Sequence, residues 1–312
     1  MNWFSGPYLD RALRRDAERL AAAHLDVDAL MVPLWHGRSL VRATSPDGER
    51  LRAVMPSRAH MQLTGAAAGT PIALGLFHGQ ACFALELQGE TMPDPALFAA
   101  GAEFADLRQI AMLLDAGEAG LLAYARAMVH WVRTHRHCGL CGSPTELAPT
   151  GHSLRCSNVQ CGHEQFPRLD PAIIVLVHDG ERALLGRQAA WPPQRYSTIA
   201  GFVEPGESLE DAVAREVAEE TGIRVTDIEY HSSQPWPFPS SLMLGFTARA
   251  TTLDIMLDDR ELEDAQWFTR ADIAAGNPRL PPRQSVAYRL IEHWYDAAAA
   301  RPLAAEPGAA RW

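Results

Sequence analysis

The chain has 312 residues, of which 47% are hydrophobic and 21% charged, and its formal net charge at pH 7 is −10. This length exceeds one average domain and allows more than one buried core. The acidic balance leaves no broad basic surface, which argues against indiscriminate binding to duplex nucleic acid. Because the N-terminal sequence has no apolar run of the signal-peptide kind and no uncharged segment reaches 18 residues, we expect a cytoplasmic protein without a membrane span.

The first part of the chain is expected to form a domain of mixed α and β structure. Residues 10–25 are helix-like, whereas residues 30–41 and 71–87 contain the apolar runs typical of strands. A turn at residues 78–80 divides the second of these runs. None of these patterns indicates a catalytic or binding site. Three roles stay open for this domain: a scaffold, a dimerisation surface or part of a substrate gate.

A mostly helical stretch over residues 104–132 leads into a cysteine-rich segment. We expect a break in this stretch near Gly117 or Gly120. Cys82 lies earlier, within an apolar run. We predict that it is a buried core residue with no redox or catalytic role.

Two close pairs of cysteines predict a zinc ribbon over residues 133–166. Cys138 and Cys141 form a C-x2-C pair, and Cys156 and Cys161 form a C-x4-C pair after a gap of 14 residues. Four thiolates with this spacing close a tetrahedral structural zinc site. A disulfide framework is one alternative, although it fits poorly with the missing signal sequence. In the other alternative, one nearby histidine replaces a sulfur: His135, His137, His152 or His163.

Beyond the ribbon, the apolar pattern predicts two pairs of strands. The first pair covers residues 172–178 and 182–186, and the second covers residues 228–233 and 242–250. Between the two pairs lies the stretch 201–223, which reads GFVEPGESLEDAVAREVAEETGI.

Most of the stretch 201–223 is predicted to be a helix. Ser208 is a good N-cap and Asp211, three residues later, stands in the position of a capping box. Gly222 is the natural C-terminal stop. An apolar stripe runs along the helix and would dock it on a sheet; it consists of Leu209, Val213 and Val217.

Three carboxylates share one strip of this helix, since Glu216, Glu219 and Glu220 lie at positions i, i+3 and i+4. Their mutual repulsion is relieved by hard divalent cations such as Mg²⁺ or Mn²⁺, which take oxygen ligands. A solvated acidic helix would explain the glutamates alone. It would not explain the flanking glycines, or Glu207 and Arg215 at their fixed offsets.

A second distinctive tract, SQPWPFPSS, covers residues 233–241. Proline at this density is excluded from a central strand, so we expect a stiff loop that presents Trp236 and Phe238 at fixed angles. A rigid structural connector is the alternative.

The stretch 201–223 resembles the Nudix box, and residues 233–241 are similar to the SQPWPFPxS array of the NADH pyrophosphatase branch of the Nudix hydrolase family. The ribbon, residues 166–171 and residues 280–294 resemble the same branch in order and spacing. The C-x4-C pair departs from members that have C-x2-C, which affects the ribbon geometry but not its ligands.

The resemblance implies an α+β fold: an N-terminal mixed α/β domain, a zinc ribbon, and a C-terminal Nudix α/β/α sandwich with a mixed sheet. We place these parts at residues 1–132, 133–166 and 167–297. An Ala-rich flexible tail with no assigned function follows at residues 298–312.

The implied reaction is metal-dependent hydrolysis of the pyrophosphate bond of NADH or NAD⁺, giving AMP and nicotinamide mononucleotide. Glu216 and Glu220 are the first choices as Mg²⁺ or Mn²⁺ ligands, with Glu219 as a third ligand or the base. The resemblance adds Glu261 as a ligand from another loop. Other carboxylates crowd the same segment: Asp258, Asp259, Glu263 and Asp264. We expect Arg215 to orient the carboxylates through charge-assisted pairs and Glu207 to anchor the loop.

Recognition of the two planar bases of the substrate should rest on stacking. The resemblance assigns the substrate contacts to Phe202, Phe166, Gln234, Trp236, Ser241 and Ala287. It also implies a homodimer in which a base lies between Phe202 of one chain and Phe166 of the other. A core position is the alternative for Phe202, and Phe166 stands where this branch often has tyrosine.

Two other functions stay open at this point. One is a Nudix hydrolase for a different nucleotide, such as an ADP-sugar or an RNA with a 5′ NAD cap. The other is a non-enzymatic protein in which a zinc ribbon binds nucleic acid and a degenerate Nudix domain senses a nucleotide. The complete set of Arg215 and the three glutamates argues against the sensor. The sequence does not distinguish NADH, NAD⁺ and NAD-capped RNA as substrates.

Overall fold

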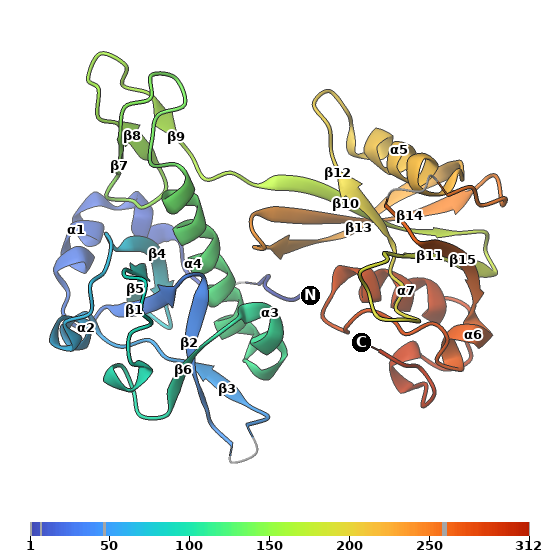
Figure 1. Cartoon of the computed structure of the whole chain (residues 1–312), viewed down its shortest axis with the longest axis horizontal. Coiled ribbons are helices and arrows are strands. Elements are labelled where there is room, and N and C mark those ends of the chain that lie inside the picture. Colours follow the sequence, from blue (N-terminus) through green and yellow to red (C-terminus); the bar gives the residue numbers. More distant parts are fainter. Residues whose placement is uncertain (1, 7, 46–47, 258–260, 312) are drawn as a thin grey trace. The chain divides into compact units, whose positions relative to one another are not determined.

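The computed structural model describes residues 2–6, 8–45, 48–257 and 261–311, which form two compact units (Figure 1). The N-terminal unit comprises Trp3–Leu169 together with Trp236–Ser240. The C-terminal unit comprises Asn2, Asp170–Pro235 and Ser241–Trp312. Both units combine helices with sheets, so the predicted α+β class is confirmed. In the part of the chain that the structure describes, no helix has both the length and the apolar character that a membrane crossing requires.

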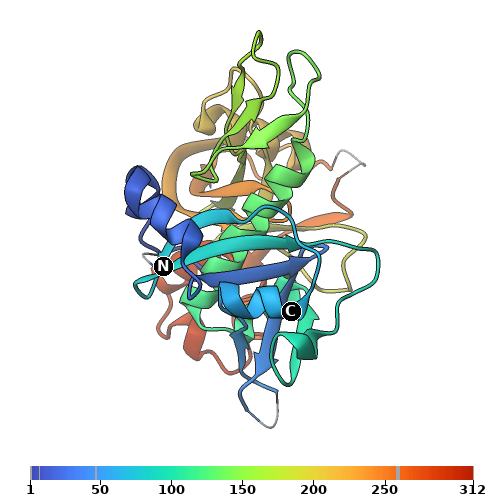
Figure 2. The ribbon, with the colours of Figure 1, turned by 90° about the vertical axis from the view of Figure 1, so that its left-hand side faces the viewer.

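A six-stranded sheet lies at the centre of the N-terminal unit. The elements before the ribbon are η1 (Ala12–Arg15), α1 (Ala17–Leu25), β1 (Leu30–Trp35), β2 (Arg38–Ala43), β3 (Leu51–Ala53), α2 (Arg58–Thr64), β4 (Ile72–Phe77), β5 (Gln80–Leu87), η2 (Pro95–Leu97), β6 (Ala102–Ala105), α3 (Leu107–Ile110), η3 (Ala111–Leu113) and α4 (Ala116–Thr134). The strand order is β3-β2-β1-β5-β4, with β6 paired to β2, and β1 is parallel to β5. Helices α1 and α2 cover one face and α4 covers the other, so each face buries its own apolar cluster (Figure 2).

The helical stretch before the ribbon begins and breaks at different residues from those expected. Residues 104 and 105 belong to β6, and the break falls at Leu114 and Asp115. The break therefore lies two residues before Gly117, close to the predicted position, and not at Gly120. The Asp115 carboxylate accepts a hydrogen bond from the Gly117 N–H and so begins α4. Gly120 lies inside α4, and a glycine is needed there because a Cβ at this position would overlap the Tyr8 ring.

Cys82 is fully buried on β5, as predicted for a core residue. Burial raises the pKa of its thiol to about 12. At neutral pH the thiol is therefore protonated, and a redox or nucleophilic role is disfavoured.

The ribbon is a small three-stranded antiparallel sheet at the end of the N-terminal unit. Its strands are β7 (Thr145–Leu147), β8 (Leu154–Cys156) and β9 (Glu164–Gln165), in that order across the sheet. Cys138 and Cys141 precede β7, Cys156 is the last residue of β8, and Cys161 lies between β8 and β9.

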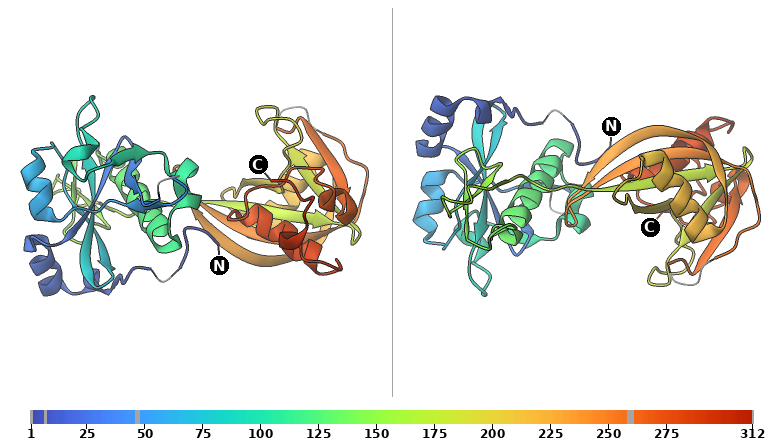
Figure 3. Two further views of the ribbon diagram at one scale, coloured as in Figure 1. Left: turned by 90° about the horizontal axis from the view of Figure 1, so that it is seen from below. Right: turned by 90° about the horizontal axis from the view of Figure 1, so that it is seen from above.

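A second six-stranded sheet forms the centre of the C-terminal unit. Its elements are β10 (Asp170–His178), β11 (Arg182–Arg187), β12 (Ile199–Phe202), α5 (Leu209–Thr221), β13 (Val225–Trp236), β14 (Ser241–Ala250), β15 (Asp264–Thr269), α6 (Arg270–Ala274), α7 (Val286–Asp296) and η4 (Leu303–Ala305). The strand order is β13-β14-β10-β11-β15, with β12 paired to β10. The sheet is mixed, because β10 is parallel to β14 and antiparallel to β11 and β12. Helix α5 packs on one face and α7 on the other (Figure 3), as the predicted sandwich requires.

The proline-rich tract departs from the expected loop. Strand β13 extends through Pro235 to Trp236, and only residues 237–240 form a turn. The loop prediction was therefore wrong for residues 233–236 and for Ser241, which begins β14. Pro235 is tolerated because β13 is an edge strand, where a missing N–H need not interrupt a hydrogen-bond ladder.

The last residues of the chain pack on the C-terminal unit. Leu303 is fully buried, its N–H donates to the Asp296 carboxylate over 2.7 Å, and the Leu280 N–H donates to the Ala310 carbonyl over 2.8 Å. These contacts differ from the flexible tail that the Ala-rich sequence suggested, since Leu303 supplies an apolar anchor. The domain boundaries at residues 132, 166 and 297 stay predictions.

Candidate active site and zinc site

Helix α5 forms at the residues that the sequence indicated. The Ser208 hydroxyl accepts from the Asp211 N–H, and the Asp211 carboxylate accepts from the Ser208 N–H, which completes a capping box. Gly222 ends the helix at φ 72°, in the left-handed region that favours glycine. Val213 and Val217 are fully buried against the sheet. These caps and the buried stripe fix the direction of the opposite, acidic face.

Three carboxylates converge beside α5. One oxygen from each of Glu216, Glu220 and Glu261 lies within 4.8 Å of the others. Glu216 is only 7% exposed and Glu220 8%, whereas Glu261 is exposed in the segment before β15. We call these three residues the acidic cluster. Glu219 does not belong to it.

Charge repulsion and burial perturb the acidic cluster. Burial, reinforced by the charges of Glu216 and Glu261, raises the pKa of Glu220 to about 8. Burial also raises the pKa of Glu216. The three carboxyl groups lie too close together to ionise without mutual repulsion. Their oxygens form a donor set that fits a hard divalent cation. The geometry of the acidic cluster therefore fits a divalent metal ion.

Arg215 connects the acidic cluster to the loop before α5. Its Nε and Nη2 donate to the two carboxylate oxygens of Glu207 at 2.5 and 2.9 Å. Its Nη1 donates to Glu216 at 2.9 Å and to Glu219 at 3.0 Å. A further bond of 2.9 Å from Nη2 reaches the carbonyl oxygen of Phe202. The hydrogen bonds from Arg215 lower the pKa of Glu207 to about 2, so this pair stays charged.

Gly201 leaves space for the Glu216 carboxylate. A Cβ at Gly201 would overlap all three carboxylate atoms of Glu216. Strand β12 fixes this glycine, because Gly201 is paired with Ile173 of β10. The sequence identified Gly201 as the start of the motif, but the reason for a glycine emerges only from the fold.

Gly201→Ala should displace the Glu216 carboxylate and lower kcat/KM by about 10²-fold, the scale expected for a misplacement of ~1 Å at a catalytic centre. Steady-state kinetics with the nucleotide substrate proposed below measures this effect. Gly69→Ala is the matched control, since a Cβ there meets only ordinary contacts at 3.5 and 3.6 Å. A folded Gly201→Ala protein with more than a third of the wild-type kcat/KM would contradict the prediction.

The other candidate carboxylates before and within β15 have partners of their own. Glu263 forms an ion pair with Arg187. Asp264 accepts hydrogen bonds from the Tyr196 hydroxyl and from the Gln266 amide. Asp258 and Asp259 lie outside the described residues. Among the described candidates of this segment, Glu261 is the one that joins the acidic cluster.

Four of the predicted substrate contacts lie in the C-terminal unit. Phe202 ends β12 and is 60% exposed, and Ser241 begins β14. Gln234 is only 1% exposed: its Oε1 accepts from the Val286 N–H at 2.8 Å and its Nε2 donates to the Gln284 carbonyl at 2.9 Å. Gln234 thus holds the start of α7, a role that sequence reasoning missed.

Ala287, the second residue of α7, is buried at the same helix end. The two remaining predicted contacts belong to the N-terminal unit. Trp236 is partly buried against its core, where its ring contacts those of Phe4 and Phe238. Phe166 follows β9 and is 66% exposed. The assignment of these residues to substrate stays a prediction.

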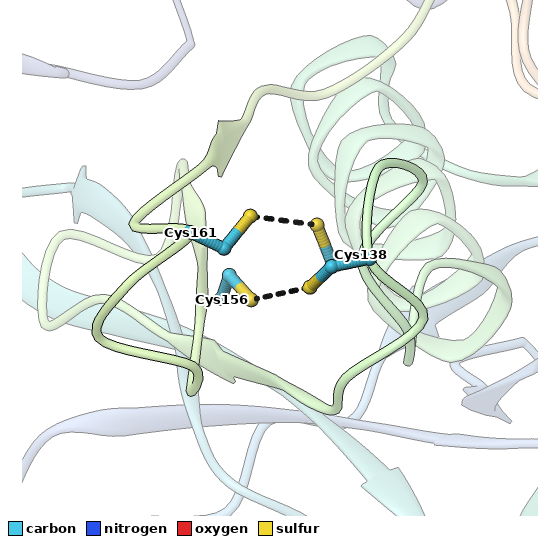
Figure 4. Close-up of side chains that lie close together, drawn as sticks. Cys138, Cys156 and Cys161 are labelled. Carbon is cyan, nitrogen blue, oxygen red and sulfur yellow. Dashed lines mark hydrogen bonds between the residues drawn. The ribbon is translucent and has the colours of Figure 1, made fainter.

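The four ribbon cysteines converge as a tetrahedral metal site requires (Figure 4). Their sulfurs all lie within 4.8 Å of one another, with Cys138 to Cys161 at 3.8 Å and Cys141 to Cys156 at 3.4 Å. Four ligands at the usual zinc–sulfur distance would be ~3.8 Å apart. Hydrogen bonds to Ser143 lower the pKa of Cys141 to about 6, whereas burial raises the pKa of Cys156 to about 12.

The two alternatives for the ribbon are disfavoured. All five cysteines, each within the described ranges, are free thiols. Among the described residues, the metal-binding group at the ribbon contains sulfur ligands alone. Two of the candidate histidines are engaged elsewhere, since the His135 ring contacts the Trp131 carbonyl and the His152 ring contacts Tyr124.

Comparisons with known proteins cover almost the whole chain. Residues 168–293 match a family model described as NUDIX domain, and residues 28–131 match one described as NADH pyrophosphatase-like rudimentary NUDIX domain. Residues 133–166 match the NADH pyrophosphatase zinc ribbon domain.

Three relatives share more than two fifths of their aligned residues with this chain. NAD-capped RNA hydrolase NudC of Stutzerimonas stutzeri is 42% identical over 75% of this chain and 81% of its own length. NudC of Mycobacterium bovis is 45% identical over 62% of this chain and 66% of its own length. NAD-capped RNA hydrolase NUDT12 of Macaca fascicularis is 42% identical over 57% of this chain, which spans only 42% of that longer protein. The chain belongs to the NADH pyrophosphatase branch of the Nudix hydrolase family.

Proposed function

We propose that this chain hydrolyses the pyrophosphate bond of NAD(H), releasing AMP and nicotinamide mononucleotide, which is reduced when the substrate is NADH. The acidic cluster beside α5 is the observation that carries the proposal, because it combines buried carboxylates with a site for a divalent metal. The family descriptions and the names of the relatives support the same substrate class.

The residues of the site would have different roles in such a reaction. Glu216, Glu220 and Glu261 would hold Mg²⁺ or Mn²⁺, which when bound neutralises pyrophosphate oxygens and acidifies water. Arg215 keeps Glu216 in place and holds the Glu207 loop through its hydrogen bonds. Glu219 is exposed and receives a hydrogen bond from Arg215, so it serves as a further ligand or as the base that takes a proton from water.

A 5′ NAD cap on RNA is the second candidate substrate. The relatives are named NAD-capped RNA hydrolases, and the cap contains the same pyrophosphate bond with an RNA chain attached. The proposed zinc ion at the ribbon cysteines is structural in either case. We also propose a cytoplasmic location.

Initial rates on NADH, NAD⁺ and NAD-capped RNA, measured with one preparation, test the proposal. Turnover should require Mg²⁺ or Mn²⁺ and should give AMP from both free dinucleotides. Faster turnover of an ADP-sugar than of all three substrates would replace the proposal with a sugar-nucleotide hydrolase. Tight nucleotide binding without turnover of any substrate would indicate a sensor instead.

We further propose a homodimer in which each active site includes Phe166 of the partner subunit. Two exposed phenylalanines support it. Phe202, at the end of β12 before the loop that leads into α5, is 60% exposed, and Phe166, the last residue of the ribbon, is 66% exposed. A base held between two such rings gains about 1–3 kcal/mol from each stack. Phe166→Ala should therefore lower kcat/KM by about tenfold or more with the metal ligands intact.

Mixing two chains with complementary defects tests the shared site. A heterodimer of Glu220→Gln and Phe166→Ala chains has one site that lacks both groups and one site with both intact. Activity after subunit exchange should rise well above that of either parent. If demonstrated exchange restores nothing, or if the protein is a monomer at assay concentration, the shared site is disproved.

A further inference from the structure

The turn between β13 and β14 contains the part of the proline-rich signature that the proposed chemistry does not use. This turn, residues 237–240, belongs to the N-terminal unit together with Trp236, the last residue of β13, although the residues on both sides belong to the C-terminal unit. Side chains of the N-terminal unit contact this turn directly.

Two arginines of the N-terminal unit hold the Phe238 ring. The guanidinium carbon of Arg108, from α3, lies 4.6 Å from the ring centre, and that of Arg126, from α4, lies 5.2 Å from it. Phe4 packs edge-on at 6.1 Å, and Phe238 is buried as a result. A guanidinium over an aromatic face is attractive, and the attraction grows as water is excluded.

The same arginines also bind the backbone of the turn. Arg126 Nε donates to the Pro237 carbonyl at 3.0 Å, and Arg108 Nη2 donates to the Phe238 carbonyl at 3.3 Å. Another N–H group of Arg126 donates to the carbonyl of Gly37. Arg108 and Arg126 therefore contact both the ring of Phe238 and the backbone carbonyls of Pro237 and Phe238.

The residues that flank the turn are those that the sequence assigned to substrate. Gln234 lies two residues before Trp236, and Ser241 follows Ser240 directly. Gln234 also holds the first residue of α7 through its bond to Val286. Gln234 and Ser241 each lie within a few residues of the turn along the chain, so a displacement of the turn would move both of them.

We propose that Arg108 and Arg126 are positioning residues that clamp the turn at Phe238 and so hold Gln234 and Ser241 in place for the nucleotide. The clamp acts on binding and not on the reacting bond, and this inference rests on the proposed function. The signature tract then divides into a clamped turn, residues 237–240, and the flanking residues to which substrate contacts are assigned, Gln234, Trp236 and Ser241.

Kinetics of Arg126→Ala should show about a tenfold higher KM for NADH, with kcat and the Mg²⁺ requirement within twofold of wild type. Arg126→Lys keeps a cation over the ring and should recover part of the loss. Arg58→Ala is the matched control, because Arg58 lies 4.9 Å over the Phe83 ring and its Nε donates to the Asp26 carbonyl at 3.1 Å in the same unit. An unchanged KM in Arg126→Ala, with stability lowered as in Arg58→Ala, would overturn the proposal.

Amide hydrogen exchange gives a readout that does not depend on activity. Exchange in peptides covering residues 234–241 and the start of α7 should be faster in Arg126→Ala than in wild type and unchanged in Arg58→Ala. Equal exchange in all three proteins would disprove the clamp. If wild type fails to hydrolyse NADH, the proposed function is lost, whereas the exchange comparison still decides whether the clamp exists.

Discussion

Glu220→Gln should lower kcat by about 10²-fold or more, the range for a group that positions a catalytic metal or transfers a proton. Glutamine keeps the size of the side chain and removes the charge, so the metal loses one of its carboxylate ligands. Kinetics at saturating Mg²⁺ or Mn²⁺ measures the loss. Glu210→Gln, on the exposed first turn of the same helix, should leave kcat within twofold. A loss below about threefold for Glu220→Gln would refute its role.

Glu220→Gln should also stabilise the metal-free protein against unfolding. Burial and neighbouring charge raise the pKa of Glu220 from its ordinary value of 4.5 to about 8, so its ionised form is disfavoured in the folded state. Below pH 4.5 Glu220 is protonated in both the folded and the unfolded protein, so its burial does not reduce the free energy of unfolding. As pH rises from there through about 8, the unfolded protein releases this proton more readily than the folded protein, and the free energy of unfolding falls. In excess chelator, Glu220→Gln should therefore raise the melting temperature more at pH 9 than at pH 5. A gain that does not increase with pH would contradict this explanation.

Cys138→Ser should abolish stoichiometric zinc binding and unfold the ribbon. Structural zinc contributes about 10–16 kcal/mol of apparent binding free energy in small zinc-binding peptides, and an opened tetrahedron loses much of it. Metal analysis should find one zinc per wild-type chain, and calorimetry should show a lower melting temperature for the variant. Cys82→Ala is the control, because it removes a buried thiol outside the site and should leave the zinc content unchanged. A soluble Cys138→Ser protein with full zinc and an unchanged melting temperature would contradict the assignment.

Features that depend on local sequence were predictable. Ser208 and Asp211 form a capping box, Gly222 ends α5, and both are set by side-chain chemistry within a few residues. The four ribbon cysteines converge because their spacing in the chain matches a closed site. In each case the residues that make the contact lie near one another in the sequence.

Features that depend on distant partners were not predictable. Pro235 lies in a strand because β13 has a free edge, which only the strand order reveals. The grip of Arg126 on the turn joins residues 111 positions apart. Gly120 is required by the Tyr8 ring, which lies 112 positions away in the sequence.

Hydrolysis of NADH in oxygen-18 water, followed by mass spectrometry of the products, tests the central claim most directly. We predict AMP and reduced nicotinamide mononucleotide, with one heavy oxygen in the phosphate of one of them, only when Mg²⁺ or Mn²⁺ is present and only with Glu220 intact. Release of free nicotinamide with the label in ADP-ribose, or undiminished turnover in excess chelator, would contradict the claim.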